Sequence, residues 1–166
     1  MQMKAFFSAL GLILCLAPTA MAGSFDVGAR YGRTIEQDGG NLEVAARYFP
    51  IPFLSLGASL GYANLRYDKG WYYKKADTLP LGGYVNAHLP LPQFKPYAGV
   101  GVVYYSVNDI SSPNQLDRGE DHSGTMTVQG GVDISLPLPK LSLNVEARRL
   151  INDRQTLFLG GVWFRF

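Results

Sequence analysis

The stretch Thr-Leu-Phe-Leu-Gly-Gly-Val-Trp-Phe-Arg-Phe, residues 156–166, decides the fold of this chain. Successive side chains of a β-strand point to opposite faces. One face of this stretch would carry Phe158, Gly160, Val162, Phe164 and Phe166, and the other Leu157, Leu159, Gly161, Trp163 and Arg165. A strand of about ten residues with aromatic side chains along one face suits the wall of a membrane barrel. The alternative is a core strand of a soluble sandwich.

The first 22 residues have the pattern of a secretory signal peptide. Lys4 gives a positive start, residues 5–17 form an apolar run, and Ala20-Met21-Ala22 is a small-x-small cleavage site. We therefore predict a leader over residues 1–22 and a mature chain of one domain, residues 23–166, that begins at Gly23.

The single cysteine, Cys15, lies inside this leader. Leu14 precedes it, where a lipidated cysteine requires a small neighbour, so we do not expect a lipoprotein. Removal of the leader leaves no cysteine to form a disulfide, a thiol nucleophile or a thiolate metal site.

Charge and hydropathy narrow the class of protein. Without Lys4, fourteen of the fifteen basic residues remain beside thirteen acidic ones, a mature net charge of +1. Such a balance does not favour a nucleic-acid partner. After the leader, no apolar run approaches the roughly 20 residues of a transmembrane helix. A closed barrel is the other way for a chain to cross a bilayer, and a hydropathy average does not detect its strands.

The mature chain divides into eight segments in which apolar residues alternate with polar or small ones. The predicted strands are residues 24–33, 42–49, 54–67, 76–89, 96–107, 125–136, 141–150 and 156–166. Pro80 lies within the fourth strand and removes a ladder hydrogen bond, so we predict a local bulge there. An even number of strands places the amino and carboxyl ends of the mature chain at the same rim of the barrel.

Three connections repeat a Pro-x-Pro pattern: Phe-Pro-Ile-Pro at 49–52, and Leu-Pro-Leu-Pro at 89–92 and 136–139. They alternate with connections that are mostly longer and more polar, the longest being residues 108–124. If the final phenylalanine faces the periplasm, the Pro-x-Pro turns are periplasmic and the polar loops face outward.

The faces opposite the apolar ones carry four acidic and four basic residues. These are Asp26, Arg30, Glu43, Arg47, Asp133, Glu146, Arg148 and Arg165. Unpaired charge would be costly in the core of a soluble sandwich, whereas an eight-stranded barrel has an interior just wide enough to be filled by side chains. The sequence therefore predicts an all-β protein, an eight-stranded antiparallel up-and-down transmembrane β-barrel with an ion-pair network in its lumen.

A Lys-Pro-Tyr-x-Gly-x-Gly run at residues 95–101, together with the leader and the terminal aromatic strand, resembles the small outer-membrane barrels of the OmpA-transmembrane and OmpW-like group. The resemblance implies a bacterial outer-membrane protein whose Phe164 and Phe166 are read as an assembly signal by the barrel-assembly machinery. We expect a monomer surrounded by outer-membrane lipid and lipopolysaccharide, with no cofactor.

The connection of residues 69–75 combines three aromatic residues with three lysines: Lys69, Trp71, Tyr72, Tyr73, Lys74 and Lys75. At the outer rim, the aromatic rings would lie at the headgroup level and the lysines could pair with glycolipid phosphates. The alternative is a solvated loop with an aromatic belt.

His88 and His122 are the only histidines. Lipid A deacylases of the PagL type resemble this barrel in size, but their His-x-Ser-Asn motif is replaced here by Glu-Ala-Arg-Arg at residues 146–149. The two histidines also lack the spacing of a metal-ligand pair. We therefore expect no metal site and no enzyme, and lipid A modification stays the third hypothesis.

The leading hypothesis is a structural or surface-interaction protein with a plugged lumen. The second is a narrow channel for small or apolar solutes, which is favoured by Gly57, Gly61, Gly99 and Gly101 on inner faces. The same glycines could instead make room for large neighbours such as Tyr97, Tyr105 and Trp163, so the sequence leaves both interpretations open.

Overall fold

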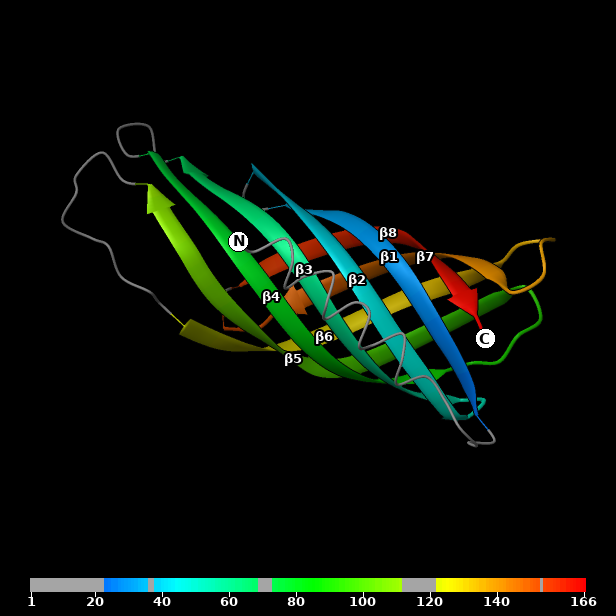
Figure 1. Ribbon diagram of the computed structural model, residues 1–166. Coiled ribbons are helices and arrows are strands. Elements are labelled where there is room, and N and C mark those ends of the chain that lie inside the picture. Colours follow the sequence, from blue (N-terminus) through cyan, green and yellow to red (C-terminus); the bar gives the residue numbers. More distant parts are fainter. Residues whose placement is uncertain (1–22, 36–37, 69–72, 112–121, 153) are drawn as a thin grey trace.

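The computed structural model describes residues 23–35, 38–68, 73–111, 122–152 and 154–166. These residues form a closed antiparallel barrel in which each strand pairs with the next and the last with the first (Figure 1). The strands are β1 (Ser24–Thr34), β2 (Asp38–Ile51), β3 (Leu54–Asp68), β4 (Tyr73–His88), β5 (Phe94–Ser111), β6 (His122–Ser135), β7 (Leu141–Leu150) and β8 (Gln155–Arg165). The predicted fold class is confirmed. The predicted leader, residues 1–22, lies outside the described residues.

The terminal strand closes the barrel. β8 pairs with β7 on one side and with β1 on the other, where Asp26 lies opposite Arg165 and Ala29 opposite Val162. Because closure satisfies the backbone groups of both edge strands, no described strand is left with an open edge in the bilayer.

Several strands are longer than the alternating pattern indicates. β7 begins and ends where predicted, whereas β2 starts at Asp38 instead of Leu42 and β5 runs on to Ser111 instead of Val107. Backbone pairing does not require apolar side chains, so a ladder can continue into a polar segment. β3, β4 and β5 have 15, 16 and 18 residues and reach beyond the other strands at one end of the barrel (Figure 1).

The predicted bulge at Pro80 is wrong in position. The register of β4 against β5 shifts between Asp77 and Thr78, and Pro80 itself pairs in register with Tyr105. Against β3 the register is the same on both sides of the proline, but the β3–β4 ladder lacks the pair between Gly61 and Pro80. The missing N–H of proline thus leaves a gap in one ladder without an inserted residue.

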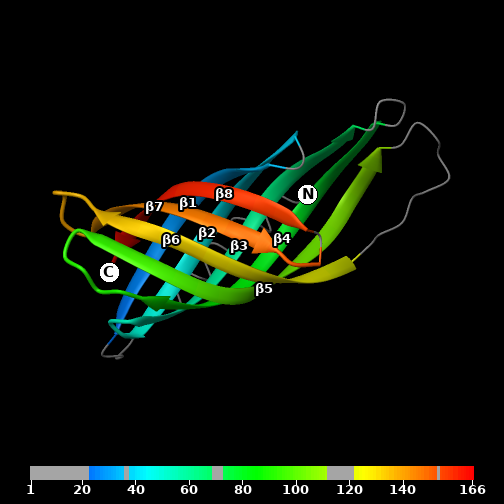
Figure 2. The ribbon, with the colours of Figure 1, turned by 180° about the vertical axis from the view of Figure 1, so that it is seen from behind.

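The start of β1 and the end of β8 both lie at the rim that carries the three Pro-x-Pro turns (Figures 1 and 2). Ser24 at the start of β1 pairs with Phe49, and Leu141 at the start of β7 pairs with Phe164. We call this end the turn rim and the opposite end the loop rim.

The outer surface is apolar on all sides. Large exposed apolar side chains include Val100, Val102, Val128 and Val145 on successive strands. Aromatic rings are exposed toward both ends, with Tyr31, Tyr62, Tyr104 and Phe158 nearer the loop rim and Phe53, Phe94, Phe164 and Phe166 nearer the turn rim. An apolar band between two aromatic girdles is the exterior expected of a barrel surrounded by lipid.

Among the described residues, no helix has the length and hydropathy needed to cross a membrane.

Candidate functional site: ion pairs and vestibule in the barrel lumen

Two arginines and two glutamates form a closed ring of ion pairs across the middle of the lumen. Arg30 Nη2 lies 2.7 Å from Glu43 Oε2, and Arg30 Nη1 lies 2.9 Å from Glu146 Oε2. Arg148 contacts the other oxygen of each glutamate, at 2.8 Å from Glu43 Oε1 and 2.7 Å from Glu146 Oε1. We call Arg30, Glu43, Glu146 and Arg148 the central ring. Every carboxylate oxygen in it therefore has an arginine partner.

Two neutral side chains complete the central ring. Asn41 Nδ2 donates to Glu43 Oε1 at 2.9 Å, and the Tyr97 hydroxyl donates to Glu146 Oε2 at 2.6 Å. Glu43, Glu146 and Arg148 are each only 1% exposed. Buried charges are tolerated only when they are paired and hydrogen-bonded, and these contacts meet that requirement.

The other four predicted lumen charges form a second set nearer the turn rim. Arg47 Nη2 lies 3.1 Å from Asp26 Oδ2 and 2.7 Å from Asp133 Oδ2. Arg165 donates two hydrogen bonds to the same Asp26, from Nε to Oδ1 at 2.8 Å and from Nη2 to Oδ2 at 2.9 Å. We call Asp133, Arg47, Asp26 and Arg165 the rim chain, because it is linear and its last member is partly exposed.

The structure thus places all eight predicted charges inside the barrel. Strand register accounts for some pairs, since Arg30 lies opposite Glu43 on β1 and β2. The pair of Arg148 with Glu43 instead joins β7 to β2 across the lumen, because these strands are not neighbours.

Aromatic rings fill the space beside the arginines. Arg47 lies over the Trp163 ring, 4.2 Å from its centroid, and Arg148 lies over Tyr84 at 4.5 Å. Both rings are buried. A guanidinium on an aromatic face gains a cation–π attraction that strengthens when the pair is desolvated. Tyr84 was not singled out from the sequence, although its alternation with Gly82 and Asn86 places it on the inner face.

The inner glycines make room for these rings. A Cβ added at Gly28 would come within 2.7 Å of the Trp163 ring, and one at Gly131 within 2.7 Å of the Tyr97 hydroxyl. At Gly101 the added atom would collide with the Tyr84 ring. Of the four glycines that the sequence singles out, Gly101 faces the Tyr84 ring, whereas Gly61 lies against Glu43, Gly99 lies against Asn86 and Gly57 has only ordinary contacts.

The centre of the lumen is closed. Between Arg30, Arg47, Tyr84, Tyr97 and Trp163 remains a cavity of only ≈ 10 Å³. A single water needs about 10–15 Å³, so this space cannot form a continuous aqueous path. Two larger open spaces, of ≈ 320 and ≈ 360 Å³, lie toward the turn rim.

Ser55 and His88 form the one nucleophile–base pair found in the described lumen. The Ser55 hydroxyl lies 2.8 Å from His88 Nε2, but Ser55 is 0% exposed. Among the described residues, His88 Nδ1 has no hydrogen-bond partner, so none of their carboxylates orients the imidazole as in a catalytic triad. The geometry is that of a buried polar contact. Among the described residues, no group of three or more potential ligands could hold a metal ion.

Other predicted sites lie partly outside the described residues. Lys69, Trp71 and Tyr72 of the predicted glycolipid loop are not described, whereas the backbone of residues 73–75 belongs to β4 instead of a loop. His122 likewise begins β6, although the sequence places it in a loop. Phe164 and Phe166 of the predicted assembly signal project from the outer surface, with ring centroids 5.0 Å apart.

An apolar exterior, a charged and closed interior and eight antiparallel strands together define a small membrane β-barrel. Solved structures of bacterial outer-membrane proteins share this fold. The N-terminal β-barrel domain of Pseudomonas aeruginosa OprF superposes with a TM-score of 0.62 at 17% identity, covering 87% of this chain and 99% of that one. Ail, the attachment invasion locus protein of Yersinia pestis, gives 0.57 at 12% identity, covering 88% and 100%. The outer membrane enzyme PagL gives 0.50 at 13% identity, covering 85% and 98%.

No protein-family model matches the chain, and no curated protein sequence matches it either. The likeness to the solved structures, in contrast, shows that the protein has the fold of the small outer-membrane β-barrels, as the sequence predicts.

Proposed function

We propose that this protein is a structural or surface-interaction barrel of the bacterial outer membrane whose lumen does not conduct. The observation that carries the proposal is the closed centre of the lumen, where a cavity of only ≈ 10 Å³ remains beside the central ring. A barrel filled in this way offers its outer surface and its loops, not its interior, for function.

The outer-membrane location is supported by three independent features. The exterior carries an apolar band between two aromatic girdles. The sequence predicts a cleavable leader and a terminal aromatic assembly signal, Phe164 and Phe166. With the final phenylalanine facing the periplasm, the turn rim lies on the periplasmic side and the loop rim faces outward.

Conductance tests the closed lumen. The protein, expressed with its own leader and purified from outer membranes, is inserted in a planar bilayer and recorded at neutral pH. We expect no discrete steps, with heat-modifiable gel mobility showing that the barrel has formed. Reproducible steps from the unaltered protein would overturn the proposal.

A narrow channel is the second candidate function. It is supported by two open cavities of ≈ 320 and ≈ 360 Å³ that enter the lumen from the turn rim. If arginine side chains form the plug, Arg30→Ala with Arg47→Ala should raise conductance above that of the unaltered protein. Arg33→Ala is the matched control, because it also removes a positive charge but from an exposed position of β1.

A surface-interaction role would be carried by the loop rim, which faces outward. The expected contact with lipopolysaccharide is carried by Lys69, Lys74 and Lys75, whose charge suits anionic glycolipid phosphates. The similarity of fold to Ail, named as an attachment protein, is consistent with a loop-borne role. Replacing all three lysines with glutamine should weaken binding of the purified protein to lipopolysaccharide, and unchanged binding would exclude this contact.

A further inference from the structure

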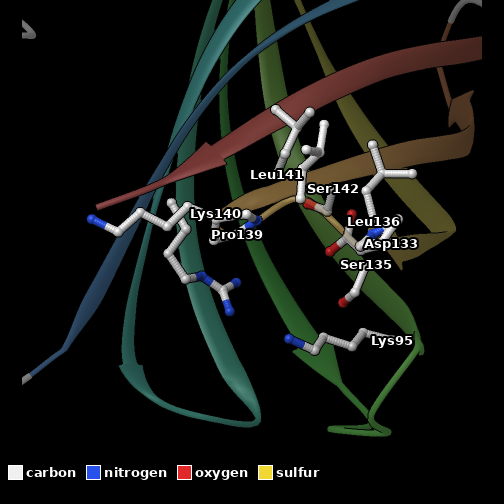
Figure 3. A pocket seen from close by; sticks show the side chains of 11 residues that line it. Lys95, Asp133, Ser135, Leu136, Pro139, Lys140, Leu141 and Ser142 are labelled. Atoms are coloured by element: carbon white, nitrogen blue, oxygen red, sulfur yellow. The ribbon is translucent and has the colours of Figure 1, made fainter.

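The mouth of the lumen at the turn rim contains two open cavities that share Lys95 and Arg165. The first, ≈ 320 Å³, lies under the β6–β7 turn between Ser135 and Ser142 (Figure 3). The second, ≈ 360 Å³, lies beside Phe49, the turn at residues 50–52 and His88. We call the two cavities together the vestibule. Each is of the size that small ligands occupy.

The two aspartates of the rim chain, of which Asp133 lines the vestibule, are already neutralised. Asp26 has both oxygens held by Arg47 and Arg165. Asp133 receives Asn144 Nδ2 on one oxygen, at 2.9 Å, and Arg47 on the other. The two aspartates and two arginines of the rim chain therefore balance one another and leave no carboxylate oxygen without a partner.

Lys95 adds a positive charge that this balance does not offset. No ion pair or hydrogen bond joins its ammonium to another of the described residues. Figure 3 shows Lys95 and the β6–β7 turn on opposite sides of the cavity, with the Lys95 amino group directed into it. Lys140 lines the first cavity as well, and if the leader is removed after Ala22, as predicted, the new amino terminus at Gly23 brings a further positive charge to the wall of the second cavity.

The walls also supply hydroxyl groups and apolar surface. Ser135 and Ser142 lie opposite each other on β6 and β7, and both line the first cavity. Leu136, Leu138 and Leu141 form the apolar part of the same wall. In the second cavity, His88 is only 5% exposed and its Nδ1 has no hydrogen-bond partner among the described residues.

We propose that the vestibule is a binding site for a small anionic molecule that carries a phosphate or carboxylate group next to a short apolar part. The ammonium of Lys95 and the exposed edge of Arg165 would hold the anion, since charge-assisted hydrogen bonds are the strongest that such groups make. The serine hydroxyls would complete its shell, and the leucines and prolines of the turn would contact the apolar part. This function is additional to the structural role and does not depend on it.

Phenyl phosphate is a suitable probe, because it combines a dianion with one small ring. The protein purified from outer membranes in neutral detergent is titrated with phenyl phosphate by calorimetry at low and at moderate salt. We expect saturable binding that weakens as salt screens the charges. Phenol, which has the ring without the anion, should not bind. Binding of phenol as tight as that of phenyl phosphate would overturn the proposal.

One lysine variant and one arginine control localise the binding. Lys95→Met keeps an unbranched side chain of similar length and removes the charge, so affinity should fall roughly tenfold or more. Arg33→Met is the control, because it also removes a positive charge, but from an exposed position of β1 that lines neither cavity. Equal losses in the two variants, or no loss in either, would show that the vestibule is not the site.

Phosphate groups could reach this rim from a soluble solute or from a phospholipid headgroup. In nanodiscs of neutral phosphatidylcholine, the soluble source predicts that phenyl phosphate binds as in detergent. In nanodiscs that contain phosphatidylglycerol, the lipid source predicts competition that Lys95→Met relieves. Either result supports an anion site in the vestibule, whereas loss of phenyl phosphate binding in both kinds of nanodisc would overturn it.

Discussion

Replacement of Arg148 by methionine should be the most destabilising single change in the lumen. Arg148 contacts Glu43 at 2.8 Å and Glu146 at 2.7 Å, so Arg148→Met removes two of the four ion pairs of the central ring. Two glutamates, each 1% exposed, would then share the single positive charge of Arg30. Breaking a buried pair by removing one partner costs about 3–5 kcal/mol, and we expect a loss of free energy of unfolding in that range.

A second substitution separates charge imbalance from lost packing. Glu43→Gln in the Arg148→Met background restores neutrality, because Arg30 and Glu146 remain as one pair at 2.9 Å. The double variant should therefore be more stable than Arg148→Met alone, with a coupling energy of roughly 2 kcal/mol. Urea unfolding in lipid vesicles, followed by tryptophan fluorescence, measures both quantities.

Arg165→Met is the control for the same type of change at the rim. Its side chain is 37% exposed, and Asp26 keeps Arg47 after the change, so the loss should be about 1 kcal/mol or less. The reasoning would be refuted if Arg148→Met were no more destabilising than Arg165→Met. A double variant in which the two losses simply added would refute it as well.

Three further changes test other parts of the structure. Gly131→Val should destabilise the barrel by about 1–3 kcal/mol because its side chain meets Tyr97, whereas Gly130→Ala, on the outer face with nothing closer than 3.7 Å, should be neutral in the same urea assay. Phe164→Ala with Phe166→Ala should reduce the fraction of folded barrel in isolated outer membranes, while Leu138→Ala in an exposed turn should not; equal yields would exclude the assembly role. Amino-terminal sequencing of the purified protein should begin at Gly23, and any other first residue would contradict the predicted cleavage site.

The sequence predicts the faces of the strands better than it predicts their partners. Strict alternation assigns a residue such as Glu146 to the inside, because a one-residue error would put its charge in the lipid. It cannot show that Arg148 reaches Glu43, since β7 and β2 are separated by two strands and the pair depends on barrel diameter and stagger.

Local irregularities are equally hidden. The register shift lies at Asp77 and Thr78, where the sequence carries no proline or glycine to mark it. Pro80 carries the strongest signal yet keeps its register, and Gly61 on the facing strand leaves room for the proline ring, since a Cβ there would lie 3.0 Å from Pro80 Cγ. The Ser55–His88 contact joins β3 to β4, and its residues are too common in type to suggest a pair from sequence alone.

The arrangement of the ion pairs determines how the lumen could open. In the central ring each arginine bridges both glutamates, so moving Arg148 aside breaks two buried ion pairs at once. Arg30 is then the one arginine of the ring that remains to pair with Glu43 and Glu146. The rim chain is linear, and Arg165 at its end can leave Asp26 while Arg47 still neutralises it. Opening should therefore begin at the turn rim and stop at the central ring. A variant that lacks only Arg165 should widen the vestibule without conducting, and conductance in that variant would show that the ring is not the barrier.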